Sequence, residues 1–333
     1  MNIRTSRTIR FVQTMACLLI TCAASGGAMA QGAKPWPTER PIQMHIGQQA
    51  GYAPDLVSRW LAEALSKELG QTVVVINKPS GGGRAMMNDL KRAAPDGYVF
   101  SNVFWHMTSA WPAFFDNLEF NPAEDFSYLG TWMTGRQMVV TYPGSGISDF
   151  KQAIELSKKQ TKSLQYGTFG VTAPGAIYMA LVVAQTKANF ESVPFKGSDA
   201  MLSIIRKDVP LLIGGLIDAQ EYIKAGTAVP LAVSGSTRLA SYPDVPTLAE
   251  LGIRGVEAGV WSGLIGPPGL PQDIVDKMNA ALRRALAQPE LRSKLEATAR
   301  DVWLTSPREM QAHIRAEIPM WTKIIKDAGL KIQ

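Results

Sequence analysis

Residues 42–69 read IQMHIGQQAGYAPDLVSRWLAEALSKEL and contain a strand, a loop and a helix in that order. Apolar residues alternate with polar ones over 42–46, which predicts a strand, and recur at helical spacing over 56–69. The loop over 47–54 turns the chain at the strand's carboxyl end. In an open α/β sheet ligands bind at that end, and the free N–H groups of the following helix favour an anion. The spacing alone is equally compatible with a plain connection.

Residues 1–30 have the layout of a secretory signal peptide. Three arginines precede an apolar stretch, and Ala28-Met29-Ala30 has the small residues expected before a cleavage point, so we predict cleavage after Ala30 and export to the periplasm. Both cysteines, Cys17 and Cys22, lie inside this segment. Lipid attachment at Cys22 is disfavoured because Thr21 stands where a small residue is expected. The mature chain must therefore be held by its core, without disulfides.

The charge of the mature chain argues against a nucleic-acid partner. The net charge of +6 falls to +3 on cleavage because the leader holds three arginines and no acidic residue. No run of lysines and arginines occurs anywhere in the sequence. No apolar run after the leader approaches the roughly 20 residues that span a bilayer. We expect a soluble extracytoplasmic protein.

Two further strands follow the opening stretch. The apolar run over 72–77 is typical of a parallel strand buried on both faces, and residues 99–104 form the next strand. The glycine-rich loop over 78–83 precedes a helix over 84–94. It lacks the Gly-Lys-Ser/Thr ending of a phosphate-binding loop, so a backbone turn is favoured over nucleotide binding. This order of elements predicts a doubly wound α/β domain.

The same pattern returns in a second unit that begins near Val139. Residues 164–168 form a strand that opens into a polar, glycine-containing loop over 168–175, and a helix follows from Ala176. Two such loops facing one another would form an anion site with one wall from each unit. The length of 333 residues likewise suggests two domains.

An aromatic stretch, FWHMTSAWPAFF, occupies residues 104–115. Because Pro112 and the polar pair Thr108-Ser109 interrupt a helical pattern, we predict a loop whose rings face a cleft. Some of these rings, such as Phe114 and Phe115, would instead pack into the core.

Several short segments together resemble one family, the periplasmic solute-binding proteins of tripartite tricarboxylate transporters, often called Bug-type receptors. In order, the segments are WPTERPI (36–42), LGQTVVV (69–75), NKP (77–79), GG (82–83), APDGY (94–98), PFKGS (194–198), AG (225–226), PDVPT (243–247) and WSGL (261–264). Individually they are weak signals, but their order is specific, and the resemblance covers nearly all of the mature chain.

The resemblance implies a type II periplasmic-binding fold, with two doubly wound α/β lobes joined by two crossing strands and a ligand cleft between them. Residues 31–139 and 259–333 would form the first lobe, and residues 140–258 the second. Family members hold a carboxylate through backbone and hydroxyl groups of the two loops. The expected partners are a small-molecule carboxylate and the membrane permease subunits, with no cofactor, no metal and a monomeric chain.

Departures from the family pattern suggest the ligand. Tyr52 stands where relatives have a glycine, rings fill the stretch from Phe104, and Trp132 and Arg136 replace small or apolar residues and proline. Thr172-Ala173-Pro174 replaces a segment richer in hydroxyls. These changes add rings and a fixed positive charge, so we predict an aromatic carboxylate, with terephthalate as the best single candidate.

The predicted ligand-binding residues come from the two loops, the aromatic stretch and the departures. They are Gln48, Gly51, Tyr52, Ala53, Pro54, Asp55, Phe104, Trp105, His106, Ser109, Trp132, Arg136, Thr168, Phe169, Gly170, Thr172 and Ala173. For Asp55 we expect loop orientation or helix capping rather than contact with an anion, which its own charge would repel.

A secreted hydrolase acting on aromatic esters is the competing class. The mature chain has no cysteine nucleophile, only three histidines, no Gly-x-Ser-x-Gly elbow and no ligands at metal spacing. Ser109 beside His106 is the candidate nucleophile and base, but such neighbours seldom work without an orienting acid. A sensor subunit that presents its ligand to a signalling partner would share the same fold.

Overall fold

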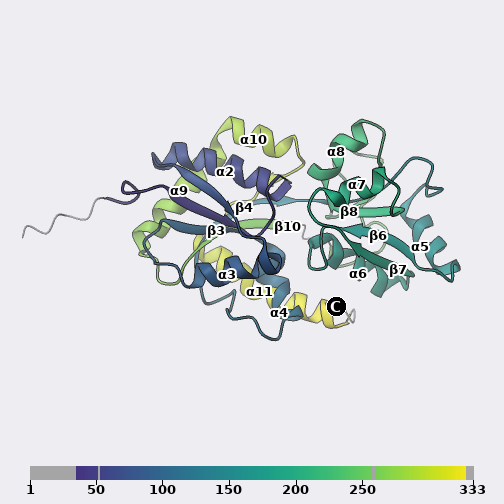
Figure 1. Cartoon of the computed structure of the whole chain (residues 1–333), viewed down its shortest axis with the longest axis horizontal. Coiled ribbons are helices and arrows are strands. Elements are labelled where there is room, and N and C mark those ends of the chain that lie inside the picture. The colour runs from purple at the N-terminus through teal and green to yellow at the C-terminus, as the bar shows by residue number, and fades with distance from the viewer. Residues whose placement is uncertain (1–34, 52, 257–259, 328–333) are drawn as a thin grey trace, which may run out of the picture.

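The computed structural model describes residues 35–51, 53–256 and 260–327 (Figure 1). The predicted leader with its cleavage point after Ala30 lies outside the described residues, as does Tyr52. The described chain forms two α/β lobes that lie side by side along the long axis of the molecule (Figure 1).

The first lobe is built on a six-stranded mixed sheet with the order β11-β4-β10-β3-β1-β2. β1 pairs in parallel with β2 and β3, whereas β10 runs antiparallel to both β3 and β4. The strands are β1 (Ile42–Ile46), β2 (Val73–Asn77), β3 (Val99–Phe104), β4 (Ser127–Gly135), β10 (Val260–Gly266) and β11 (Asp301–Val302).

Helices cover both faces of this sheet. α2, α9 and α10 gather along one side, and α3, α4 and α11 along the other (Figure 1). Their bounds are α2 (Ala53–Leu69), η1 (Ser80–Gly83), α3 (Arg84–Lys91), η2 (His106–Ala110), α4 (Trp111–Phe114), α9 (Gln272–Ala287), α10 (Pro289–Glu296) and α11 (Pro307–Asp327).

The second lobe is built on a five-stranded sheet with the order β7-β6-β8-β5-β9. β6 pairs in parallel with β7 and β8, and β5 runs antiparallel to β8 and β9. The elements are β5 (Gln137–Thr141), α5 (Phe150–Lys159), β6 (Leu164–Thr168), α6 (Pro174–Thr186), β7 (Phe190–Pro194), α7 (Asp199–Ile205), β8 (Leu211–Gly215), α8 (Leu216–Lys224) and β9 (Val229–Val233).

The chain crosses between the lobes at Arg136. β4 of the first sheet ends at Gly135 and β5 of the second sheet begins at Gln137, so this crossing comes earlier than the boundary expected at residue 139. On the return, Val256 accepts a hydrogen bond from the Gly235 N–H and β10 of the first sheet begins at Val260; residues 257–259 lie outside the described ranges. One strand of the first sheet ends and one strand of the second sheet begins beside Arg136. The cleft lies beside this crossing, since residues 135–137 line it.

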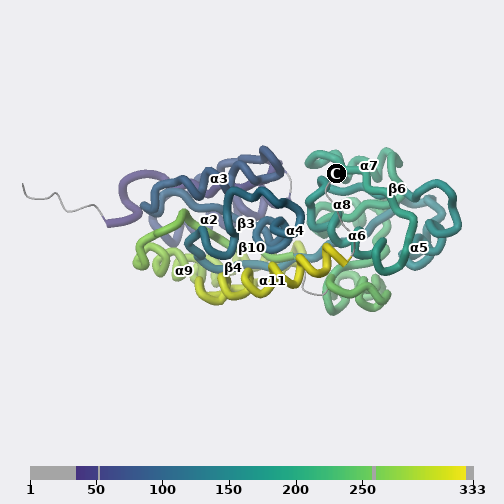
Figure 2. The backbone as a smooth tube through the Cα atoms, turned by 90° about the horizontal axis from the view of Figure 1, so that it is seen from below, coloured from purple at the N-terminus to yellow at the C-terminus, as the bar shows by residue number. Residues whose placement is uncertain are grey.

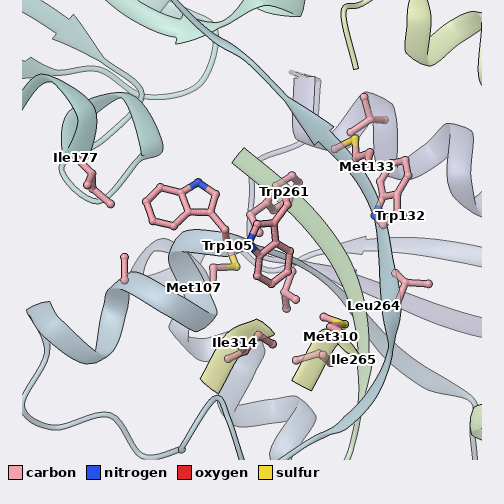
Figure 3. Packing of buried hydrophobic residues seen from close by; sticks show 14 of the residues in the cluster. Trp105, Met107, Trp132, Met133, Ile177, Trp261, Leu264, Ile265, Met310 and Ile314 are labelled. Carbon is pink, nitrogen blue, oxygen red and sulfur yellow. The ribbon is translucent and has the colours of Figure 1, made fainter. Parts of the chain in front are cut away.

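The two lobes also touch through a stack of three rings, Trp105, Tyr178 and Trp321. Trp321 lies on α11, which runs from the first lobe towards the second (Figure 2). The ring centroids of Trp105 and Trp321 are 4.4 Å apart, and that of Tyr178 on α6 lies 6.0 Å from Trp105. The close-up of the core shows Trp105 between the helix that carries Ile177 and the strand that carries Trp261 (Figure 3). Burial of large rings therefore couples the lobes.

The aromatic stretch over 104–115 is helical, and the predicted loop is wrong. η2 follows β3 almost directly and continues into α4. Pro112 lies in the first turn of α4, directly after η2, whose C-cap Trp111 donates its N–H to His106 O, so the helical run accommodates the proline at the junction of the two segments. The hydroxyls that suggested a loop are satisfied internally, since Thr108 donates to Trp105 O and Ser109 to Glu317.

Candidate functional site

A cavity of about 440 Å³ lies between the lobes. Its first-lobe wall includes the loop after β1 and the start of α2, and its second-lobe wall includes the loop over 169–175 and the start of α8. These segments follow the carboxyl ends of β1, β6 and β8. The volume is in the range of small-molecule sites in proteins.

Asp55 holds the loop after β1 in place. It is 3% exposed and accepts hydrogen bonds from the Gly51 N–H at 3.0 Å, from Asn77 Nδ2 at 2.9 Å and from both Nε and Nη2 of Arg59 at 2.9 Å. Burial by itself would raise the pKa of this carboxyl, but the hydrogen bonds from Arg59, Gly51 and Asn77 lower it below its usual value. The carboxylate is thus satisfied within the first lobe, as expected for a loop-orienting residue.

Two helix starts face the same cavity, one from each lobe. α2 begins at Ala53, and α6 begins at Pro174 after Ala173, whose side chain makes no capping hydrogen bond. Ala53 and Ala173 both line the cavity. Helix starts present backbone N–H groups and the positive end of the helix dipole, which favour an anion. At the start of α2 the Ala53 N–H donates to Asp218 Oδ1, an anion of the protein itself.

Six rings line the cavity, four from the first lobe and two from the second: Phe104, His106, Phe115, Trp261, Phe169 and Phe195. Trp261 is 2% exposed, and its Nε1 donates to Glu317 Oε2 at 2.9 Å, which fixes the indole. Phe169 packs closely over β8, where a Cβ at Gly214 would lie 2.4 Å from the ring. The lining therefore offers flat apolar walls on both sides.

His106 contributes a neutral ring. It is 7% exposed, and burial lowers the pKa of its imidazole to about 3. The ring lies edge-on to Trp111, with centroids 5.9 Å apart. At neutral pH this side chain therefore adds a polar surface and no charge.

Four cationic side chains and one acidic side chain line the cavity. The cations are Arg84, Arg136, Lys196 and Arg300, and the acid is Asp218. Arg300 is 9% exposed, and burial lowers its pKa to about 10 although Asp218 acts in the opposite direction. Burial raises the pKa of Asp218 to about 6, although the charge of Arg300 and hydrogen bonds from the N–H groups of Ala53 and Gly215 lower it. The excess of positive charge makes the cavity suited to an anion.

A family model decides the class of protein. The model described as "Tripartite tricarboxylate transporter family receptor" matches residues 57–330. The chain belongs to this receptor family.

Similar proteins agree with this assignment. The receptor is 25% identical to protein BugT of Bordetella pertussis, over 98% of this chain and 100% of BugT. It superposes on the periplasmic binding protein BugD with a TM-score of 0.82 at 29% identity, covering 89% of this chain and 99% of BugD. The R. palustris protein Rpa4515, solved with adipate, gives a TM-score of 0.83 at 26% identity over 89% and 99% of the two chains. The resemblance and the two-lobed periplasmic-binding fold are confirmed.

Ten of the predicted site residues line the cavity of the receptor. They are Gln48, Ala53, Pro54, Phe104, His106, Arg136, Phe169, Gly170, Thr172 and Ala173. Arg136 lines the cavity, and its Nη1 donates to Ser234 O at 3.2 Å, beside the crossing between the lobes. Contact of these residues with a ligand stays a prediction.

Other predicted residues lie outside the cavity lining. Trp132 is fully buried and donates from Nε1 to Asn102 Oδ1 at 3.0 Å and to Ser262 Oγ at 3.1 Å, so it ties three strands together. Trp105 is 1% exposed within the stack between the lobes. Both rings were expected at the cleft. They pack inside because a buried strand and the start of η2 turn these positions towards the core.

The small polar residues also serve the fold. Ser109 is fully buried, donates to Glu317 Oε2 at 2.6 Å and lies outside the cavity lining. Thr168 is fully buried, and its hydroxyl donates to Gly170 O at 3.3 Å within the second-lobe loop. Gly51 is exposed beyond the lining and has a φ of 93°, and Asp55 lies behind the first loop. Thr168, Gly51 and Asp55 thus shape the loops that line the cavity, and Ser109 joins η2 to α11.

Sequence reasoning missed four charged residues of the lining, Arg84, Lys196, Asp218 and Arg300. Asp218 lies in the first turn of α8, and Arg300 just before β11, in segments without a motif. Phe195 and Trp261 lay within quoted family segments without being assigned to the site. Their positions on the cavity wall follow from chain packing, for which a single sequence carries no local signal.

The described residues hold neither a metal cluster nor a membrane span. Across residues 35–51, 53–256 and 260–327, no group of three or more His, Cys, Asp or Glu side chains is arranged to bind a metal ion. Within these ranges, none of the helices combines the length and apolarity that a membrane span requires.

Proposed function

We infer that this receptor is an extracytoplasmic solute-binding protein that captures an aromatic carboxylate by lobe closure and delivers it to membrane permease subunits. Terephthalate is the best single candidate. The observation that supports this function is the cavity lining, which combines rings from both lobes, the start of α6 and an excess of cations. The leader would be removed after Ala30, and the mature monomer would act in the periplasm.

The chemistry of the lining matches a flat anion. Rings that pack on rings contribute about 0.5 to 1.5 kcal/mol beyond area burial, and a hydrogen bond to a charged group about 1.5 to 3 kcal/mol. Two of each would supply much of the roughly 8 kcal/mol that micromolar affinity requires, before ordering costs. A dicarboxylate would place one carboxylate near the first lobe and the other near the α6 start, where Thr172 lines the wall.

A similar protein gives independent support for a carboxylate. Rpa4515, at 26% identity, was solved with adipate, an aliphatic dicarboxylate. The rings in the present cavity favour a flat ligand over an aliphatic one of the same charge. The alternatives are a hydrolase and a sensor subunit. Ser109, the candidate nucleophile of a hydrolase, is buried against Glu317, and a sensor would use the same cavity with a different partner.

Calorimetry tests the proposed function. The purified mature protein is titrated with terephthalate, benzoate, adipate, glutarate and citrate. We expect terephthalate or benzoate to bind most tightly. Tight binding of citrate or adipate with no heat from either aromatic acid would contradict the aromatic preference. Release of the bound acid unchanged, shown by chromatography, would separate a receptor from a hydrolase.

A further inference from the structure

Arg300 is a buried cation on the cavity wall without an acidic partner at contact distance. Its side chain is nine-tenths buried, and it forms no ion pair within 4.0 Å with any residue that the structure describes. Nη1 donates to Thr298 O at 3.2 Å, and Nε has no hydrogen-bond partner. Burying a guanidinium in this way is costly. The charge of Asp218, beyond 4.0 Å, offsets the effect of burial only in part.

The guanidinium points across the cavity towards the second lobe. A Cβ at Gly215 would lie 4.0 Å from Arg300 Nη2 and 2.9 Å from Asp218 Oδ2. Gly215 ends β8 and precedes α8, and it lines the cavity together with Arg300 and Asp218. The arginine therefore reaches the space between the lobes.

Asp218 already occupies the start of α2. Its Oδ1 accepts from the Ala53 N–H at 3.4 Å, across the cleft, and the carboxylate also accepts from the Gly215 N–H. Ala53 is the first residue of α2, where the sequence placed a ligand carboxylate. Two carboxylates cannot share one position without strong repulsion. The protein's own anion thus directs a ligand carboxylate elsewhere on the first-lobe wall.

The other cations of the lining are engaged or exposed. Arg136 donates to Ser234 O, and the guanidinium of Arg84 lies 4.4 Å from the centre of the Phe115 ring and donates to Gly81 O. Lys196 is exposed. Of these four cations, Arg300 combines burial with an unpartnered nitrogen and a position opposite the second lobe.

We propose that Arg300 is the first-lobe anchor for the ligand carboxylate, and that Asp218 acts as a tethered anion that closes the start of α2 to the ligand. This inference rests on the proposed function, because it concerns the same cavity and the same class of ligand. It assigns the carboxylate to a side chain rather than to the backbone loop. The second carboxylate of a dicarboxylate then meets the start of α6.

Arg300→Gln tests the anchor, with Arg315→Gln as the matched control. Arg315 lies on α11 in an exposed ion pair with Glu124, so its replacement removes the same charge outside the cavity. Calorimetry uses benzoate, terephthalate and adipate. For every acid that the wild type binds, we expect R300Q to weaken binding by about tenfold or more, and R315Q by less than about threefold. Equal effects of the two variants would overturn the anchor.

Asp218→Asn tests the tethered anion. As a second variant it keeps the proposal testable if R300Q fails to fold. We expect D218N to bind terephthalate and adipate at least about threefold more tightly than the wild type, because an anion at the α2 start is then no longer repelled. Unchanged or weaker binding of terephthalate and adipate, where the wild type binds them, would overturn this role. Thermal unfolding of each variant shows whether it is folded. If the wild type binds adipate and neither aromatic acid, the aromatic preference fails, while the R300Q comparison on adipate still decides the anchor.

Discussion

The backbone N–H of Ala53 donates to Oδ1 of Asp218 over 3.4 Å, and this hydrogen bond joins the two lobes at the cavity. The acceptor is an acid whose pKa burial raises from 3.8 to about 6. The contact between the lobes therefore depends on a group that titrates near neutral pH.

Stability should respond to the ionisation of Asp218. Between about pH 4 and 6 the folded chain holds a proton on this carboxyl that the unfolded chain has lost. The contribution of Asp218 to stability is thus fully present below about pH 4 and is lost as pH rises through about 6. Asp218→Asn should gain up to about 3 kcal/mol relative to the wild type between pH 4 and pH 7.5, measured by urea unfolding. Asp244→Asn, at an exposed position, is the control, and the same pH slope in both variants would contradict the prediction.

His106 should stay neutral in acid while the protein is folded. Burial holds its pKa at about 3, against an ordinary value of 6.5, so the unfolded chain binds a proton below about pH 6.5 and the folded chain does not. This difference removes stability as pH falls from 6.5 towards 3. His106→Gln should lessen the loss at pH 5 by about 2 kcal/mol. An NMR titration in which the imidazole of His106 protonates near pH 6.5 would contradict it.

Truncation of Glu317 should destabilise the receptor and leave the indole of Trp261, which lines the cavity, without its hydrogen-bond acceptor. The carboxylate is 5% exposed and accepts from Ser109 Oγ and Trp261 Nε1. Glu317→Ala leaves these buried donors unpaired, so we expect a loss of about 2 to 4 kcal/mol in the free energy of unfolding. Glu124→Ala breaks an exposed ion pair with Arg315 and should cost less than about 1 kcal/mol. Comparable losses in the two variants would argue against the network.

Loss of the Trp321 ring should cost more than loss of its neighbour on α11. Trp321 is 1% exposed and packs on Trp105, whereas Met320 is 42% exposed. Trp321→Ala should lower the free energy of unfolding by about 3 to 5 kcal/mol through the cavity that it leaves. Met320→Ala should change it by about 0.5 kcal/mol or less. Denaturant titrations of the pair measure the difference, and a small loss in W321A would mean that the ring stack adds little.

Local sequence patterns predicted the strands well. The strands expected over 42–46, 99–104 and 164–168 match β1, β3 and β6, because alternation and β-branched runs are local properties of a chain. β4 was missed. Its residues form a nearly fully buried strand between β10 and β11, and a run with few polar interruptions carries no period of two.

The aromatic stretch shows where local rules fail. Pro112 and Thr108-Ser109 argued for a loop, but the helical run accommodates Pro112 at the junction of η2 and α4, and both hydroxyls find partners inside the lobe. One of those partners is Glu317, which lies 208 residues further along the chain from Ser109. A local sequence pattern cannot predict a contact with a residue so far along the chain. The helix is possible at this position because its buried polar groups find hydrogen-bond partners in the folded protein.

The sequence by itself determined the two α/β units, the loops at their carboxyl ends and, through ordered motifs, the receptor family. These features depend on periodicity and turn chemistry within short segments. Only the tertiary structure decided which side chains face the cavity. Trp132 turns inward because its strand is buried on both faces, while Asp218 and Arg300 meet the cavity because α8 and the segment before β11 pack from opposite lobes. The direction of a side chain is fixed by packing between elements distant in sequence, and that information appears only when the chain is folded.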